Sequence, residues 1–503
     1  MILIVKFCKT SIRNVKFEKL IISKCQQIEM KISFSSAVNL SAVTYGIICG
    51  WPSPIVPLLM NVEKNPVINE QMSDEGASWI GSLLCLGGLA IAPFSSSLAE
   101  RFGRKAYGYL TAGPMFLSWL LILFATDHNC LYVARFIAGV AGSMSIFIVS
   151  TYVSEIASEN IRGLLGSLLV LAINIGILLA FVAGTYMSYV LFHVFCMVFP
   201  VLFAVSFFFL PETPVYLLKR NRISEATRSL LYYRGNNKAL VSEELSRLQA
   251  QVKSSVDQPN SISLCDLVRD PATLKGLIIS FGLLGGQQLS GIFAMISYAE
   301  TIFKMAGTSL QPEVSAIIIG VIQVFSSYLS TVLMERAGRR PLILVSCAGM
   351  CICHFIIGSF CYVQSSGHDL SSISFLPIIA LSAYMVSYCL GMGPVPFVVA
   401  SEVFRTEVSS FANTVCFVFL WGMAFTVIKL FGPLMSLVGI EGCFTILGCM
   451  CAGCFVFSYY LVPETKARKR EDIVNELNNN QVNVNTKEHM IDNSKDLIMS
   501  ERV

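Results

Sequence analysis

The sequence predicts an all-α membrane protein whose twelve transmembrane helices form two six-helix halves joined by a cytoplasmic helical linker. Three observations carry this prediction. Apolar segments of about 20 residues, the length that crosses a bilayer, recur along the chain. Of the 503 residues, 54% are hydrophobic and 14% are charged, whereas soluble domains carry about 25% charged residues. A charged phrase with a central glycine occurs twice, at 100–105 and 335–340, so that one copy falls in each half.

The predicted elements follow the apolar segments in order. In the first half, 35–210, spans are expected near 35–60, 77–97, 107–126, 131–153, 164–187 and 190–210. The polar stretch 211–273 has helical texture and is predicted to be the linker. In the second half, 274–461, spans are expected near 274–298, 314–334, 341–363, 374–400, 410–433 and 438–461. The polar ends 1–34 and 462–503 are predicted to be tails with little apolar surface to bury.

The composition argues against several classes of function. The net charge of +4 is too small to indicate a nucleic-acid partner. Most of the 17 cysteines lie inside apolar runs, where they act as small hydrophobes, so we predict neither a metal site nor a disulfide framework. The sequence has no phosphate-binding glycine-rich loop with its lysine and no credible catalytic triad. We therefore expect no cofactor and no enzymatic activity.

The basic residues predict the orientation in the membrane. They gather in the loops assigned to the inner side and in the linker, whereas the outer loops hold only Lys64 and Lys304. Lysine and arginine favour the cytoplasmic side of a membrane. Both termini and the linker are therefore predicted to be cytoplasmic.

The repeated phrase predicts a charged latch on the inner face of a duplicated bundle. Many secondary transporters are built from such repeats. The residues assigned to the latch are Glu100, Arg101, Arg104, Arg135, Glu155, Arg162, Glu335, Arg339, Arg340 and Glu402, the last of which ends the tenth span. Glu155 and Glu402 are expected to pair with nearby arginines of the phrase through charge-assisted hydrogen bonds. Two alternatives are a static set of ion pairs and basic loops that only fix orientation.

Uncharged polar residues deep in the spans are the candidates for binding a solute. Gln287 and Gln288 stand together in the seventh span and Gln323 in the eighth. Buried amides are costly unless they form hydrogen bonds, and they both donate and accept, which suits sugar hydroxyls. The alternative is bonding between neighbouring helices, which is favoured for Asn174 in the fifth span. Trp421 in the eleventh span offers a flat face for a sugar ring, or ordinary packing.

Helix breakers cluster in the tenth span, where Gly393 stands beside Pro394 and Pro396. Proline removes a backbone donor and kinks helices, and membrane helices break where they line a cavity. We predict a mobile gate here, with a fixed kink as the alternative.

Taken together, these phrases resemble the sugar porter family of the major facilitator superfamily, over about residues 35–466. The similarity covers the repeated phrase and the segments 152–155, 211–214, 287–292, 391–396 and 463–466. Segment 174–178 and the stretch around Arg234 look most like the facilitated trehalose transporter subgroup. The resemblance implies the major facilitator fold and a central site that takes a hexose or a disaccharide.

By position, the resemblance assigns sugar contacts to Gln287, Gln288 and Gln323, an aromatic wall to Trp421 and a gate to Tyr298. Phe293 stands where relatives carry asparagine, which removes a polar sugar contact. Ser409 and Ser410 replace an arginine–glycine pair after the tenth-span acid, so the second latch lacks one cation.

The first span bears on the mechanism. Proton-coupled relatives carry a carboxylate where this chain has Ile48, which favours passive transport of hexose or trehalose by alternating access. A proton-coupled sugar or polyol symporter, a non-transporting sugar sensor and a carrier of another solute stay open as alternatives. A monomer in the lipid bilayer of the plasma membrane is expected.

Overall fold

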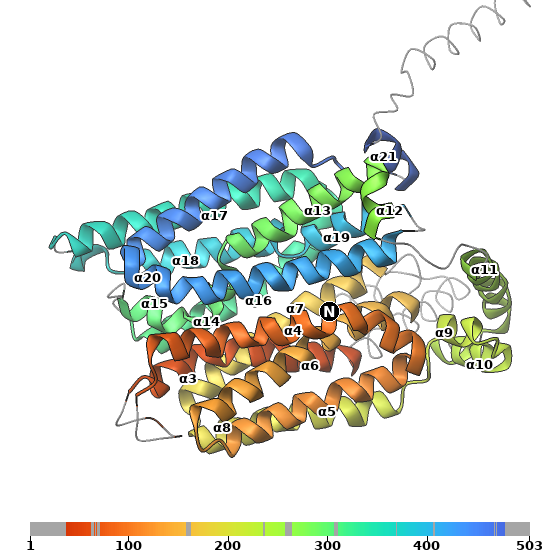
Figure 1. Ribbon diagram of the computed structural model, residues 1–503, viewed down its shortest axis with the longest axis horizontal. Coiled ribbons are helices and arrows are strands. Elements are labelled where there is room, and N and C mark those ends of the chain that lie inside the picture. The colour runs from red at the N-terminus through yellow and green to blue at the C-terminus, as the bar shows by residue number, and fades with distance from the viewer. Residues whose placement is uncertain are drawn as a thin grey trace, which may run out of the picture.

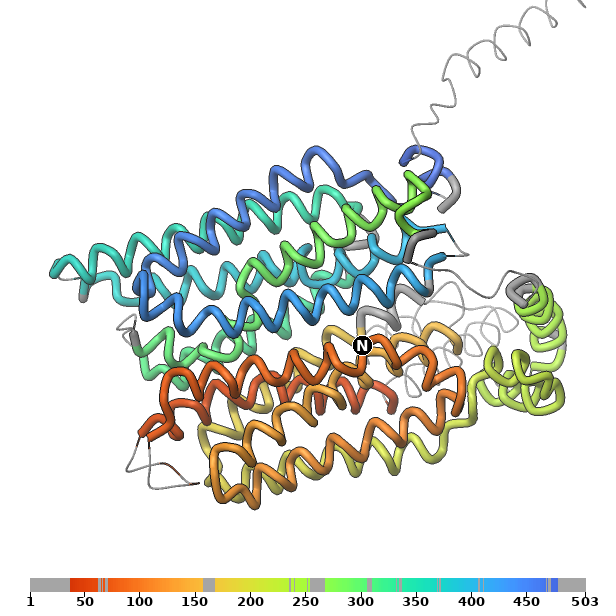
Figure 2. The backbone as a smooth tube through the Cα atoms, viewed as in Figure 1, coloured from red at the N-terminus to blue at the C-terminus, as the bar shows by residue number. Residues whose placement is uncertain are grey.

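The computed structural model describes residues 37–61, 65, 67, 71–156, 162–234, 237–256, 264–305, 310–368, 370–405, 408–466, 468 and 470–477. Within these residues every regular element is a helix. Two bundles lie side by side, the first coloured red to yellow and the second green to blue (Figure 1). The smoothed backbone shows the same division (Figure 2). The predicted all-α architecture is therefore confirmed.

The helix bounds follow the chain. The first bundle contains the span Ala37–Leu59, which ends in α3 (Pro52–Leu59), then α4 (Asp74–Phe102), α5 (Arg104–Leu123), α6 (His128–Ile156), α7 (Arg162–Tyr186) and α8 (Tyr189–Phe208). The connection between the bundles contains α9 (Pro214–Lys219), α10 (Ile223–Tyr233), α11 (Lys238–Val256) and α12 (Leu264–Arg269).

The second bundle contains more breaks than the first. Its helices are α13 (Pro271–Leu289), α14 (Ile292–Ser297), α15 (Ala299–Met305), α16 (Pro312–Ala337), α17 (Arg339–Ser365), α18 (Leu376–Ser387), α19 (Val395–Glu402) and α20 (Ser409–Leu461). A 3₁₀ turn (Ser371–Ile373) precedes α18, a π-helical turn (Tyr388–Met392) separates α18 from α19, and α21 (Arg470–Leu477) follows α20.

The last two spans form one continuous helix in the secondary-structure assignment. Among the described residues, 11 helices are long and apolar enough to cross a membrane, and the last of them, Phe411–Leu461, has 51 residues. A bilayer needs only about 20 residues. Gly439 has a left-handed conformation, with φ 72° and ψ 172°, and breaks this helix. Two spans therefore meet at Gly439, which is consistent with a twelve-helix topology.

Close contact between the first span and α7 positions one wall of the space between the bundles. A Cβ atom added to Gly46 would lie 2.0 Å from the carbonyl oxygen of Ile173, and one added to Gly176 would lie 2.1 Å from that of Val43. Only glycine allows backbones to approach so closely, as is common between membrane helices. The contact fixes the position of Asn174 along α7 and its rotation about the helix axis, because Asn174 lies between Ile173 and Gly176.

The connecting helices identify the two ends of the molecule. α9, α10 and α11 lie together beyond one end of the first bundle, which we call the linker end; the opposite end is the far end (Figure 1). The α10 helix buries Leu230 and Tyr233. The hydroxyl of Tyr233 lies 2.8 Å from that of Tyr152 in α6, so the linker docks onto the first bundle.

Candidate functional site

A cavity between the two bundles, the central cavity, brings together the amides singled out in the sequence. It encloses about 810 Å³ of space not occupied by protein atoms, part of which is open to solvent. Both bundles line it, and its amide-bearing residues are Asn174, Gln287, Gln288 and Gln323. The other residues around it are mostly apolar. A mostly apolar pocket with a few polar groups suits a small neutral solute.

The side chain of Gln287 supports the broken tenth span. Its Nε2 donates to the carbonyl oxygens of Met392, at 2.9 Å, and Gly393, at 2.8 Å. These carbonyls lie where the π-helical turn ends and the regular hydrogen-bond pattern is interrupted. Gln287 is 2% exposed and lines the cavity. Its donor group is therefore used within the protein.

Gln288 and Gln323 each keep an unused acceptor. Their amide nitrogens donate to Gln287 Oε1 at 3.3 Å and to Asn174 Oδ1 at 2.9 Å, respectively. Both Oε1 atoms are buried and have no hydrogen-bond partner among the described residues. An unsatisfied buried acceptor costs about 1–3 kcal/mol. A ligand with hydroxyl donors would recover that cost.

Asn174 connects the two bundles. It accepts from Gln323 of α16, and its Nδ2 donates to the hydroxyl of Ser327 on the same helix. Asn174 is 4% exposed and lines the central cavity. These contacts agree with the interpretation favoured for Asn174 from the sequence, which is a hydrogen bond to a neighbouring helix.

The remaining walls are apolar and aromatic. Trp421 is 3% exposed, and its ring lies edge-on to Tyr45 with centroids 6.4 Å apart. A Cβ added to Gly88 would lie 2.7 Å from the Trp421 ring, so α4 fixes the indole through close approach. Phe293 also lines the cavity, and its ring stands where the resemblance implies a lost polar contact.

The two bundles contact each other at the far end. Tyr298 donates to the carbonyl oxygen of Ala77 at 3.5 Å, and Ser78 donates to that of Lys429 at 3.1 Å. The Lys429 ammonium lies 3.9 Å from the centroid of the Trp79 ring. These contacts join α4 of the first bundle to elements of the second. Of the residues assigned to the gate, Tyr298 therefore lies at this junction, whereas Pro394 and Pro396 flank the start of α19.

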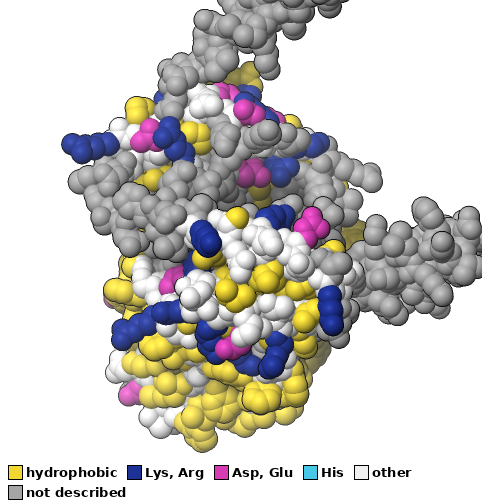
Figure 3. Space-filling model, turned by 90° about the vertical axis from the view of Figure 1, so that its right-hand side faces the viewer, with side chains coloured by type: hydrophobic (Ala, Val, Ile, Leu, Met, Phe, Trp, Pro, Cys, Tyr) yellow, Lys and Arg dark blue, Asp and Glu magenta, His cyan; other side chains and the backbone are white. Residues whose placement is uncertain are grey.

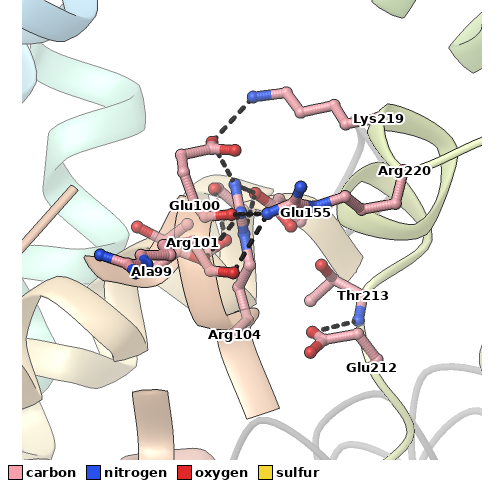
Figure 4. Close-up of polar contacts among 11 residues, drawn as sticks. Ala99, Glu100, Arg101, Arg104, Glu155, Glu212, Thr213, Lys219 and Arg220 are labelled. Carbon is pink, nitrogen blue, oxygen red and sulfur yellow. Dashed lines mark hydrogen bonds and ion pairs between the residues drawn. The ribbon is translucent and has the colours of Figure 1, made fainter. Parts of the chain in front are cut away.

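Charged residues of the first copy of the repeated phrase form a cluster at the linker end (Figure 4). Arg104 donates to Glu155 Oε1 through Nε at 3.0 Å and Nη2 at 2.8 Å, and to Glu100 at 2.8 Å. Lys219 of α9 contacts the same Glu100 oxygen at 2.8 Å. Arg220 donates to the backbone carbonyl of Arg101 at 3.1 Å. The cluster joins helices within the first bundle and ties them to the linker.

The second copy forms a looser cluster. Arg339 lies 3.3 Å from Glu402, and these side chains are 19% and 28% exposed. Arg340 donates to the backbone carbonyl of Tyr459. The side chains of Glu335 and Arg162, two further residues of the predicted latch, lie outside the described residues. The pairs expected for Glu155 and Glu402 are thus present, each within its own bundle.

Two further carboxylates, for which the sequence predicted no role, lie in these clusters. Glu212 accepts from the backbone N–H of Lys105 at 3.0 Å, and Glu464 accepts from those of Arg339 and Arg340 at 3.0 and 3.1 Å. Each carboxylate caps the helix that begins after a phrase glycine, an arrangement favoured by the helix dipole. The only signal in the sequence was the shared Pro-Glu-Thr motif at 211–213 and 463–465.

The two capping carboxylates differ in their electrostatics. Burial raises the pKa of Glu212 above its ordinary value, although backbone N–H donors and Arg104 oppose the change. Burial acts in the same direction at Glu464, but four backbone N–H donors outweigh it and lower the pKa of that carboxyl. Glu464 is therefore the more firmly ionised cap.

Arg135, expected in the inner charge cluster, lies elsewhere. It is 1% exposed and donates to the carbonyl oxygens of Ile80 at 3.0 Å and Ile48 at 2.8 Å. Its guanidinium lies 5.3 Å from the Trp51 ring centroid. Glu155 stands 20 residues farther along α6, about 30 Å away at 1.5 Å per residue. The expectation was wrong because Arg135 lies near the other end of its span.

Comparison with known proteins places these features among transporters. The family profile "Sugar (and other) transporter" matches residues 38–477. The facilitated trehalose transporter Tret1 of Aedes aegypti is 33% identical over 437 residues, covering 87% of this chain and 54% of that protein. Tret1 of Culex quinquefasciatus is 33% identical over 445 residues, covering 88% of this chain and 86% of that protein. The chain spans about half the length of the first of these relatives.

Solved structures share the fold. The partially occluded inward-open xylose transporter XylE from E. coli has a TM-score of 0.73 and 21% identity, covering 88% of this chain and 100% of that one. XylE bound to 6-bromo-6-deoxy-D-glucose, described as a proton:xylose symporter of the major facilitator superfamily, gives a TM-score of 0.71 and 20% identity, covering 89% and 99%.

Proposed function

Because the chain belongs to the sugar transporter family, we propose that it carries a sugar, a hexose or trehalose, across a membrane by alternating access. The protein is a multi-pass membrane protein with the major facilitator fold. The relatives named as facilitated trehalose transporters support the choice of substrate class.

The observation that carries the proposal is the pair of unused acceptors at the central cavity. Gln288 Oε1 and Gln323 Oε1 are buried and receive no hydrogen bond from any residue that the structure describes, and both residues line the same cavity. Sugar hydroxyls donate to such oxygens, while the aromatic face of Trp421 suits the apolar C–H face of a pyranose ring. The sugar is expected to donate hydroxyl hydrogen bonds to these two oxygens and so to join the amide network.

The arrangement of contacts supports alternating access. The bundles are joined at the far end through Tyr298 and Ser78, whereas the charge clusters at the linker end each stay within one bundle. Glu155 Oε2 and Glu402 Oε2 are buried and have no hydrogen-bond partner in the part of the chain that the structure describes. We propose that these oxygens accept hydrogen bonds from the opposite bundle when the linker end closes, which would make the clusters a latch.

Passive transport is supported by the surroundings of Arg135. Its guanidinium is bound by backbone carbonyls, including that of Ile48. No Asp or Glu lines the described part of the central cavity. Without a carboxylate in that lining to exchange protons, sugar movement is expected to follow the sugar gradient alone.

The linker end is proposed to be cytoplasmic. Lys and Arg side chains gather on this end (Figure 3), and such residues favour the cytoplasmic side. This orientation would place both termini in the cytoplasm, with the protein acting as a monomer in the plasma membrane.

The test is counterflow in proteoliposomes, using radiolabelled glucose and trehalose. We expect Gln288→Ala to abolish counterflow and Gln364→Ala, outside the cavity lining, to leave it unchanged. An imposed pH gradient is expected to cause no accumulation above equilibrium; accumulation would instead establish proton-coupled symport. Full counterflow by Gln288→Ala would show that the sugar does not depend on the central cavity for transport.

A further inference from the structure

A second hollow between the bundles, which we call the vestibule, adjoins the central cavity toward the linker end. It holds about 770 Å³ of empty space. Ile146 and Trp421 line both spaces, so the two meet at these side chains. α4 and α6 of the first bundle form one wall of the vestibule, and the first part of α20 forms the other.

The polar lining of the vestibule differs in kind from that of the central cavity. Amides dominate the central cavity, whereas five hydroxyls from the first bundle face the vestibule: Ser95, Ser96, Ser143, Ser150 and Thr151. No Lys, Arg, Asp or Glu occurs in its described lining. Uncharged groups that both donate and accept match a neutral, polyhydroxylated ligand.

Three of these hydroxyls form no hydrogen bond with the described part of the chain. Ser95 and Ser150 donate to carbonyl oxygens one turn earlier, at 3.1 and 2.7 Å. For Ser96, Ser143 and Thr151, the described residues provide no hydrogen-bond partner. Ser143 is nevertheless only 6% exposed. A nearly buried hydroxyl that faces a cavity without a partner indicates that something other than the protein binds it.

The aromatic residues and the length of the vestibule fit a sugar ring. Phe147, Phe417 and Trp421 contribute aromatic faces. Along α20 the lining runs from Trp421 to Asn413, eight residues away, or about 12 Å of helix. This length leaves room for a second pyranose ring, in addition to a ring bound at the amides of the central cavity.

We propose that the vestibule is a second binding position for a sugar ring, occupied after the sugar leaves the amides and passes Trp421. This inference rests on the proposed function. Ser143 and Thr151 of α6 would bind ring hydroxyls on the path to the linker end. The position affects the affinity measured from the linker side and leaves the affinity measured from the far side unchanged.

The experiment measures glucose uptake and efflux in oriented vesicles for Ser143→Val, Thr151→Val and the control Ser154→Val. Ser154 lies on the same helix outside the lining. Each lost hydrogen bond is expected to raise the KM from the linker side about two- to ten-fold. A passive carrier must keep equal ratios of Vmax to KM in both directions, so Vmax from that side should rise by the same factor.

The outcomes separate the inference from the proposed function. Absence of transport by the unaltered protein would refute the function itself. Transport with unchanged linker-side KM in both vestibule variants, or an equal rise on both sides, would overturn the second position and leave the carrier intact. Two variants are used so that misfolding of one, detected by loss of the monodisperse protein, still leaves a decisive measurement.

Discussion

Removing the Arg104 side chain is expected to destabilise the first bundle strongly. This side chain is 4% exposed and forms an ion pair with Glu155, itself 12% exposed, at 2.8 Å. It also bonds Glu100 and the carbonyl oxygen of Ala99. Arg104→Leu would leave the Glu155 carboxylate buried without a counter-ion. Breaking a buried pair from one side costs about 3–5 kcal/mol.

A double-mutant cycle separates this cost from lost packing. The measurement is thermal unfolding of purified protein in detergent, for Arg104→Leu, Glu155→Leu and the double variant. Because the double variant contains no unpaired buried charge, its loss of stability is expected to be smaller than the sum of the single losses. Arg104→Lys keeps the charge but not the planar fork, so an intermediate loss is expected.

An exposed pair provides the control. Arg222 and Glu225 lie 2.6 Å apart with side chains 54% and 48% exposed, and such pairs contribute about 0–1 kcal/mol. Arg222→Leu is therefore expected to change the unfolding temperature little. Additive losses in the Arg104 and Glu155 cycle, or a loss no larger than that of Arg222→Leu, would refute the argument from burial.

Three further predictions concern other parts of the molecule. Gly338→Ala is expected to lower the unfolding temperature, because φ is +94° and a Cβ would lie 2.8 Å from Glu464 Oε2. An unchanged unfolding temperature would contradict the view that the Glu464 cap requires glycine at this position. Burial, aided by the Glu313 charge, raises the pKa of Glu300 from its ordinary value of 4.5 to about 8. The stability that its neutral form provides is therefore lost as pH rises from about 4.5 to about 8 and does not change further above 8. The unfolding temperature should fall less over this range in Glu300→Gln than in the unaltered protein, and parallel curves would exclude this. Gln287→Leu removes two hydrogen bonds to the broken tenth span and is expected to lower the free energy of unfolding by about 1–3 kcal/mol. The same thermal unfolding assay measures this loss, and an unaltered unfolding temperature would show that Gln287 does not support the tenth span.

The sequence predicted what periodicity and composition control. Apolar length and charge placement predict the membrane architecture, since the bilayer imposes both. The neighbouring amides at 287 and 288 pointed to the region that lines the central cavity. Their different contacts depend on which backbone carbonyls the π-helical turn presents, and only the packed structure determines that.

Other contacts could not be read from the chain because they join distant segments. Glu212 contacts the backbone of Lys105, 107 residues away, and Glu464 contacts that of Arg339, 125 residues away. Sequence motifs mark such residues without indicating what they bind. Arg135 was misplaced although the predicted span 131–153 already sets it near the start of that span and Glu155 just past the end, which is too far apart for one charge cluster.

The two charge clusters resemble each other in sequence but differ in how firmly they are held. In the first, Lys219 at the end of α9 and Arg220 after it add contacts from the linker to the side chain and the backbone carbonyl of Glu100. In the second, the ion pair is longer and more exposed. Among the described residues, the second cluster has three buried polar atoms without a partner, Arg339 Nε, Arg340 Nε and Glu402 Oε2, whereas the first has one, Glu155 Oε2. Unsatisfied groups gain most from new partners. If the clusters act as a latch, the second is therefore expected to exchange more of its partners as the bundles rock, while the contacts of the first with the linker are expected to persist.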